Sequence, residues 1–145
     1  MIEQFLPNLI IHFMMQNNFL KNKKIILSAG ASGIGLATVK LLLSQGAFVY
    51  TCDIDKKNIN KLKKNPYFNK KLFISECDSS KEDEVKKFYK EVSNKTKKID
   101  GLINNIGIAG PTSPLEKIKS EDWEKTLQVN VNSHLYFTKI CNTHD

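Results

Sequence analysis

The sequence predicts an α/β fold in which helices cover both faces of a parallel, doubly wound sheet, giving three layers. From Lys24 onward, short apolar runs alternate with helix-like segments, and the runs are rich in β-branched and aromatic residues. A glycine cluster also stands between the first run and the first helix-like segment. Such alternation is typical of right-handed β-α-β crossovers in a parallel sheet. The 145 residues, 41% of them apolar and 26% charged, suit one globular domain.

Four apolar runs are the predicted strands. They read KIILSA (24–29), AFVYTCD (47–53), KLFISECD (71–78) and DGLINNI (100–106). Short continuous apolar runs are expected where a strand is buried on both faces of a sheet. The predicted element order is therefore β-α-β-α-β-α-β-loop-α.

The predicted helices occupy residues 34–45, 56–64, a stretch within 79–98 and a long amphipathic segment from about residue 121. Gly46 should end the first helix, because glycine tolerates the left-handed backbone of a helix C-terminus. Ser80 with Asp83 resembles a capping box for the third helix, and Ser120 is placed to cap the last one. The apolar positions at helical spacing are Ile34, Val39, Leu42 and Leu43, then Val85, Phe88, Tyr89 and Val92, then Trp123, Leu127, Val131 and Leu135.

The net charge of +7 comes from 22 basic residues, all of them lysine. They are spread from Lys21 to Lys139 rather than gathered in one stripe of the sequence. Base readout leans on arginine, which the chain lacks. A solvated lysine-rich surface is favoured over a nucleic-acid patch, so no nucleic-acid partner is predicted.

The cysteines Cys52, Cys77 and Cys141 are odd in number and include no C-x-x-C pair. Neither a disulfide framework nor a zinc ribbon is indicated, and a reducing, cytoplasmic location is predicted. His134 and His144 flank Cys141, but a second pair of metal ligands is missing from the sequence. No metal is predicted.

Residues 1–22 are predicted to be an extension ahead of a domain at 23–145. The extension contains FLPNLIIHFMM, an apolar stretch interrupted by proline and polar residues. It is too short to span a bilayer and lacks the pattern of a signal peptide. No membrane partner is predicted, and Met14 or Met15 is an alternative start.

The stretch LSAGASGIGLA sets Gly30, Gly33 and Gly35 between the first strand and the first helix. Glycines here let a pyrophosphate approach the backbone, and the helix N-terminus offers free N–H groups and the positive end of the helix dipole. Asp53 ends the second strand 18 residues after Gly35. That spacing is close to the one at which an acid accepts hydrogen bonds from the adenosine ribose. Together these features predict a Rossmann-type dinucleotide site.

Asp53 favours NAD over NADP, because its carboxylate would repel a 2′-phosphate and Ser32 brings no positive charge to the glycine loop. Lys56 and Lys57 could swing toward such a phosphate, which keeps NADP open as the less favoured cofactor. As solvated lysines in a first helical turn, they would leave the preference for NAD unchanged.

With SAGASGIG, NNIG at 104–107, and Trp123 followed seven residues later by Asn130, the chain resembles the N-terminal half of a short-chain dehydrogenase/reductase. The resemblance runs from about Lys23 to the end of the chain. It implies an oxidoreductase that transfers a hydride between NAD(P) and a small-molecule alcohol or carbonyl. The cofactor-binding set that it implies is Ser28, Gly30, Ala31, Ser32, Gly33, Ile34, Gly35, Asp53, Asp78, Ser79, Asn105, Ile106 and Gly107.

Within that set, the resemblance places Asp78 and Ser79 beside the adenine, and has Asn104 and Asn105 tie the central strand to its neighbours. Asn130 matches the family's catalytic asparagine, which supports a proton-relay water. Asparagine can also kink a helix and bind its own backbone, so a purely structural role for Asn130 stays open.

The chain departs from the family pattern at three places. Ala29 adds a methyl group where the family has a glycine with free dihedral angles, and Ile106 replaces a small alanine. The catalytic serine and Tyr-x-x-x-Lys pair of the family would follow the helix that holds Asn130, and the chain ends at Asp145. The resemblance thus implies a domain truncated after the helix that follows the fourth strand, inactive by itself.

Two alternatives to this truncated enzyme are a non-catalytic dinucleotide-binding module and a fragment without a biochemical role. Complete relatives are expected to be homo-oligomers, and the oligomeric state of this chain is left open.

Overall fold

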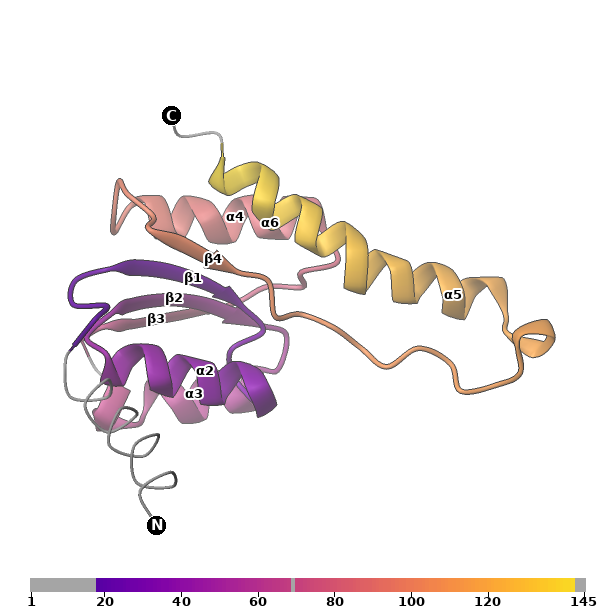
Figure 1. Cartoon of the computed structure of the whole chain (residues 1–145), viewed down its shortest axis with the longest axis horizontal. Helices are drawn as coiled ribbons and strands as arrows, with labels where there is room; N and C mark the ends of the chain where they lie inside the picture. Colours follow the sequence, from indigo (N-terminus) through magenta and orange to yellow (C-terminus); the bar gives the residue numbers. More distant parts are fainter. Residues whose placement is uncertain (1–17, 69, 143–145) are drawn as a thin grey trace, which may run out of the picture.

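A four-stranded parallel sheet forms the centre of the protein. The computed structural model describes residues 18–68 and 70–142. In it the strands β1 (Lys24–Ser28), β2 (Phe48–Asp53), β3 (Leu72–Glu76) and β4 (Gly101–Ile103) lie in the order β3-β2-β1-β4. Helices lie on both sides of this sheet (Figure 1). The predicted three-layer, doubly wound α/β fold is confirmed.

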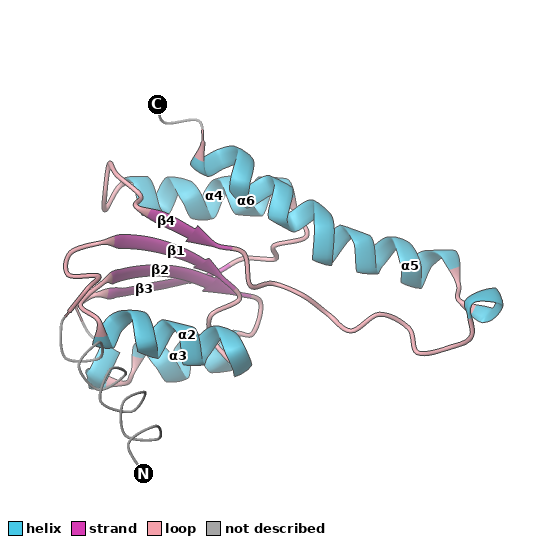
Figure 2. Ribbon diagram, in the orientation of Figure 1, coloured by secondary structure: helices cyan, strands magenta, loops and turns pink. Residues whose placement is uncertain are grey.

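Helices cover both faces of the sheet, as Figures 1 and 2 show. The helices α2 (Gly33–Ser44) and α3 (Lys56–Lys63) lie on one face, while α4 (Glu82–Ser93) and α6 (Ser133–Cys141) lie on the other. Short 3-10 turns at Pro66–Phe68 (η1) and Leu115–Lys117 (η2) complete the connections. The predicted element order is therefore correct up to the last helix, which has two α-helical parts.

Parallel pairing brings the carboxyl ends of the strands to one edge of the sheet. Ser28 of β1 pairs with Cys52 of β2, and Asp53 of β2 pairs with Glu76 of β3. In open α/β sheets this edge is where ligands bind. The side chains predicted to form a site thus meet at that edge.

Alternation along each strand sends side chains to both faces of the sheet, where they join separate apolar clusters. On the α4 and α6 side, Ile26 and Tyr50 pack with a buried cluster that contains Phe88 and Phe137. On the α2 side, Leu27 and other strand residues pack against that helix, and a third cluster lies beneath α3. Phe88 is central to the first core, because its ring lies 6.5 Å from that of Phe73 and 6.0 Å from that of Phe137.

Several local predictions differ from the structure. Ile34 was expected on the buried face of α2 but is 80% exposed, and that face is formed by Gly35, Val39 and Leu42. Ser80 does not cap α4; the N-cap residue is Lys81, and no side chain makes a capping hydrogen bond. Ser120 is the first residue of its helix rather than the cap. Gly46, by contrast, has the predicted left-handed backbone, with φ of +85°.

The last helical segment is continuous but changes its winding at the middle. The helix α5 (Ser120–Leu127) leads into a π-helical turn, η3 (Gln128–Asn132), and then into α6. Figure 2 shows α5 reaching well beyond the sheet. No residue of α5 is buried, and the apolar side chains predicted at helical spacing lie exposed. These are Trp123, Leu127, Val131 and Leu135.

Most of the predicted extension at 1–22 lies outside the described residues. Of the part that is described, Leu20 packs against the α2-side core. Its backbone N–H donates to the carbonyl of Gln45, and that of Asn22 donates to Gly46. The boundary at residue 23 stays a prediction.

Replacing Phe88 with alanine is expected to lower the free energy of unfolding by about 3–5 kcal/mol, since the ring is buried between two other aromatic rings. Urea denaturation followed by circular dichroism measures this loss. Leu41→Ala is the matched control, because Leu41 lies half exposed on α2, and its expected cost is below about 1 kcal/mol. Equal losses for both variants would contradict the packing described above.

Candidate functional site

A hollow of about 280 Å³ opens at the carboxyl edge of the sheet. Its walls come from the ends of β1, β2 and β3, the segment after β4, and the α5–η3 helix. The lining residues are Ala29, Asp53, Ile54, Cys77, Asp78, Ser79, Ser80, Ile106, Ile108, Lys125, Gln128 and Val129. Ligand pockets commonly measure about 300–1,000 Å³, so this hollow suits one part of a dinucleotide.

Two of the three predicted glycines are required by close packing. A Cβ atom on Gly30 would lie 2.1 Å from Oγ1 of Thr51, and one on Gly35 would lie 2.0 Å from the carbonyl oxygen of Ala29. Gly33 differs, since a Cβ there would meet open space, but its φ of +52° favours glycine. The loop thus lies tight against the sheet and open on its outer side.

The N-terminus of α2 has the properties of an anion site. Its N-cap residue is Ser32, no described side chain caps the helix, and the first turn contains no acidic residue. Uncapped N–H groups and the positive end of the helix dipole favour a phosphate at such a place. Ser32, Gly33 and Ile34 are exposed there.

Ala29 has a left-handed backbone, with φ of +57°. A residue with a Cβ atom pays about 1–2 kcal/mol for this conformation, which glycine adopts freely. The departure from the family glycine at this position therefore strains the loop. Ala29 is also one of the residues that line the hollow.

Ser28 and Asn105 join the ends of β1 and β4. The Ser28 hydroxyl oxygen accepts hydrogen bonds from the backbone N–H groups of Asn105, at 3.0 Å, and Ile106, at 3.1 Å. In return, Nδ2 of Asn105 donates to the carbonyl oxygens of Ser28 and Ala29, at 3.1 and 3.0 Å. Ser28 is fully buried, so it supports the loop from behind instead of facing its open side.

Asn104 was also predicted to join the central strand to its neighbours, but its side chain contacts α6 rather than β1. Its Nδ2 donates to Oγ1 of Thr138 on α6 at 3.1 Å. The two asparagines therefore connect β4 to β1 and to the covering helix.

The Asp53 carboxylate is held in place by two backbone N–H groups. Oδ2 accepts from Ala31 at 2.9 Å, and Oδ1 accepts from Asp55 at 3.0 Å. Each carboxylate oxygen can accept a further hydrogen bond. Asp53 is nearly buried and lines the hollow, so its remaining acceptor capacity faces a confined space.

Asp78 organises the loop between β3 and α4. Its Oδ1 accepts from the hydroxyl and the backbone N–H of Ser80, at 2.6 and 3.1 Å, and its Oδ2 lies 3.3 Å from Nζ of Lys81. Its own N–H donates to Glu84. Burial opposes ionisation, but the hydrogen bonds from Ser80 and the Lys81 ammonium together hold the pKa of Asp78 below its ordinary value. The carboxylate is ionised at neutral pH, and the Ser80 hydroxyl that was predicted to cap α4 is used here.

Asn130 lies in the π turn and binds the segment that follows β4. Its Oδ1 accepts from the backbone N–H of Ile108 at 2.8 Å, and its Nδ2 donates to the carbonyl oxygen of the same residue at 2.9 Å. One turn later, Nε2 of His134 lies 2.9 Å from the carbonyl oxygen of Ile106. Asn130 thus neither binds its own helix backbone nor has its amide free, since both amide atoms contact Ile108.

The structure brings only part of the predicted set around the hollow. Its lining contains four of the predicted residues, Asp53, Asp78, Ser79 and Ile106. The other predicted residues belong to the glycine loop, the first turn of α2, or the supporting layer behind them, and Gly107 lies against Asn130.

Eight lining residues were not in the predicted set: Ala29, Ile54, Cys77, Ser80, Ile108, Lys125, Gln128 and Val129. Ile54 directly follows the predicted strand end at Asp53, so its position was a usable signal. The α5–η3 residues had no such signal, because nothing local in the sequence shows where this helix meets the sheet edge.

Among residues 18–68 and 70–142, no helix is both long enough and apolar enough to cross a membrane. The same residues contain no group of three or more metal-ligating side chains placed to hold an ion.

The sheet, the glycine loop and the helix layers define a protein of the Rossmann class. Comparison with known proteins narrows this class: a family model described as short chain dehydrogenase matches residues 23–144. The chain belongs to the short-chain dehydrogenase family, whose members are oxidoreductases that generally bind NAD(P) and act on small molecules.

Two curated relatives and one solved structure illustrate the similarity. A short chain dehydrogenase/reductase of Gibberella zeae is 29% identical over 122 residues, covering 84% of this chain and 45% of that protein. A 3beta-hydroxysteroid dehydrogenase of Eggerthella lenta is 28% identical over 124 residues, covering 85% and 48%. The crystal structure of a short chain dehydrogenase from Mycobacterium smegmatis matches with a TM-score of 0.76 at 25% identity, covering 84% and 51%. The chain thus spans about half the length of these relatives.

Replacing Ala29 with glycine is expected to raise the free energy of unfolding by about 1 kcal/mol, because it removes the left-handed strain. Urea denaturation measures the change. Ala37→Gly is the matched control: the same substitution within α2, at an exposed position, should lower stability by about 1 kcal/mol. Two losses of similar size would show that Ala29 is not strained.

Proposed function

We propose that this chain is the cofactor-binding portion of an NAD(P)-dependent short-chain dehydrogenase/reductase, and that its hollow takes the adenosine part of NAD. The observation that carries the proposal is the position of Asp53. Its carboxylate is fixed by the N–H groups of Ala31 and Asp55, lies in the hollow, and stands beside the uncapped N-terminus of α2.

The residues present fit a dinucleotide. The glycine loop excludes side chains where a pyrophosphate would lie, and the first turn of α2 would hold the phosphates through its N–H groups. Asp53 would accept hydrogen bonds from the ribose hydroxyls, while Asp78 and Ser79 would border the adenine. Ile106 and Gly107 would pass beside the cofactor, with Ser28 and Asn105 holding the backbone beneath it.

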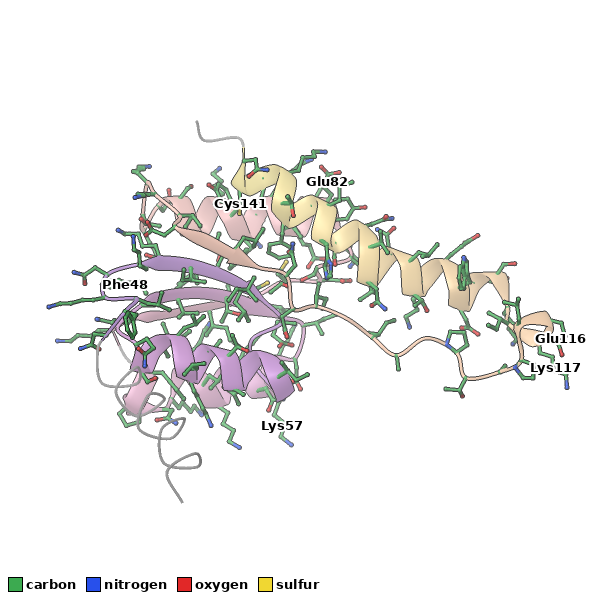
Figure 3. All side chains as sticks on the ribbon, viewed as in Figure 1. Phe48, Lys57, Glu82, Glu116, Lys117 and Cys141 are labelled. Atoms are coloured by element: carbon green, nitrogen blue, oxygen red, sulfur yellow. The ribbon has the colours of Figure 1, made fainter. Side chains whose placement is uncertain are left out.

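The preference for NAD over NADP rests on the charges around the ribose position. A 2′-phosphate would face the Asp53 carboxylate, and the lysine that lines the hollow, Lys125, comes from α5 rather than from the strand ends around Asp53. Lys56, which could have neutralised a phosphate, lies 3.3 Å from the Glu76 carboxylate. The Lys57 side chain extends away from the sheet (Figure 3).

The reaction proposed for the complete protein is hydride transfer between the nicotinamide, which supplies the redox chemistry when bound, and a small-molecule alcohol or carbonyl. Asn130 would contribute by fixing the backbone of Ile108 beside the cofactor. We expect the family's catalytic serine and Tyr-x-x-x-Lys pair to follow the helix that holds Asn130, outside these 145 residues.

Asp53→Asn is expected to weaken NADH binding. Asparagine keeps the size and one acceptor for the Ala31 N–H but loses the charge-assisted hydrogen bonds to the ribose, worth about 1.5–3 kcal/mol. The Kd for NADH should rise about 10- to 100-fold in a calorimetric titration, with NADPH affected less. Glu121→Gln is the control, because Glu121 is exposed on α5. No NADH binding by the unaltered chain, or an unchanged Kd in Asp53→Asn, would reject the proposal.

The 145-residue chain should bind NADH without turning over alcohols or carbonyls, because the expected proton-transfer pair is not among its residues. Absorbance at the reduced-nicotinamide band, followed with a panel of alcohols, tests this expectation. Sustained reduction of NAD would show that residues within this chain perform the chemistry.

A further inference from the structure

One polar side chain connects the two walls of the hollow. Gln128 is the first residue of the π turn and lines the hollow. Its Nε2 donates to the carbonyl oxygen of Ser80 at 2.6 Å and to the hydroxyl of Tyr136 at 3.0 Å. Its Oε1 accepts from Nδ2 of Asn132 at 2.5 Å. Both N–H donors and the oxygen of this amide therefore have partners, which fix the amide in one orientation.

The Ser80 contact joins two segments that line the hollow. Ser80 belongs to the loop after β3, where its hydroxyl and N–H bind Asp78, whereas Gln128 is 48 residues away in the sequence. The remaining two contacts stay within the η3–α6 helix. Gln128 is thus held by its own helix and holds the loop that would border the adenine.

A second residue of the same π turn, Asn130, binds the segment that follows β4. Two residues after Gln128, Asn130 holds both backbone groups of Ile108, and Ile108 also lines the hollow. A displacement of the Ser80 carbonyl would pull on the Gln128 amide and act on the winding of the π turn. The Asn130–Ile108 pair is the next contact along that path.

From this chain of contacts we propose that Gln128 is a positioning residue, one that links filling of the hollow by an adenine nucleotide to the geometry of the Asn130–Ile108 pair. The inference rests on the proposed function, since it needs an adenosine group in the hollow. Because π turns are less regularly bonded than α-helix and often occur at functional sites, η3 is suited to respond to a neighbouring group.

The test uses adenosine 5′-monophosphate (AMP) and the full chain. The backbone N–H of Ile108 is the donor to Asn130, so its proton chemical shift reports directly on that pair. In the unaltered protein, saturating AMP should move the Ile108 and Asn130 amide resonances. In Gln128→Glu, which keeps the length but cannot donate from a carboxylate to the Ser80 carbonyl, AMP should bind about three- to tenfold more weakly and the Ile108 response at saturation should be lost.

Tyr136→Phe is the matched control. It removes one helix contact of the same amide but leaves the Ser80 contact, so the Ile108 response should persist. Gln128→Met, similar in length and without hydrogen-bonding groups, replaces the glutamate variant if the latter does not fold, and should behave in the same way.

The outcomes separate the two proposals. If AMP binds the unaltered chain but leaves Ile108 unmoved, or if the response survives in both Gln128 variants at saturation, Gln128 has only a structural role and the inference is wrong. If AMP does not bind the unaltered chain at all, the proposed function fails and the inference fails with it. Loss of the response in the Gln128 variants alone supports both.

Discussion

The site depends on the hydrogen bonds that join Ser28 to the backbone after β4. β1 and β4 pair over only three residues, Ile25 to Leu27 against Gly101 to Ile103. Beyond these residues the segments that follow the two strands must separate to leave room for a ligand. At that point the buried Ser28 hydroxyl and the Asn105 amide take the place of the backbone hydrogen bonds between the strands. They make four hydrogen bonds of 3.0 to 3.1 Å. They fix Ala29 and Ile106, both of which line the hollow. Removing these bonds would leave partly buried backbone N–H groups of Asn105 and Ile106 without these partners, which is costly.

Charge is distributed in the site by backbone groups as much as by side chains. The Asp53 carboxylate is held by two N–H donors, and the N-terminus of α2 lacks both a side-chain cap and an acidic residue. A fixed negative group for hydroxyls thus lies near a fixed positive end for phosphates. This separation suits a ligand that has both kinds of group, whereas a compact anion would be repelled by the carboxylate.

The sequence predicted the features that local rules decide. The four strands, the glycine loop and the left-handed Gly46 follow from short-range pattern and backbone geometry, and all are present. The failures are places where a distant group decided the outcome. Ser80 had the right spacing for a cap, but the Asp78 carboxylate took its hydroxyl. Gln128 was not predicted for the site, because its partner Ser80 lies 48 residues away in the sequence and is brought near only by the fold. Asn130 was singled out by resemblance, yet its contact with Ile108 depends on a π turn that no local pattern indicated.

The change of winding at η3 allows a small tilt at this turn to move the far end of α5 by a larger distance. The α6 end of this helix is anchored, with Phe137 in the core and Lys139 paired with Glu82, whereas α5 buries none of its residues. Trp123 lies seven residues before Asn130, about 10 Å along the axis at 1.5 Å per residue. A tilt of about 10° at the π turn therefore moves that indole by about 2 Å. Trp123 is the one tryptophan of the chain, so its fluorescence reports on a change of geometry at the site.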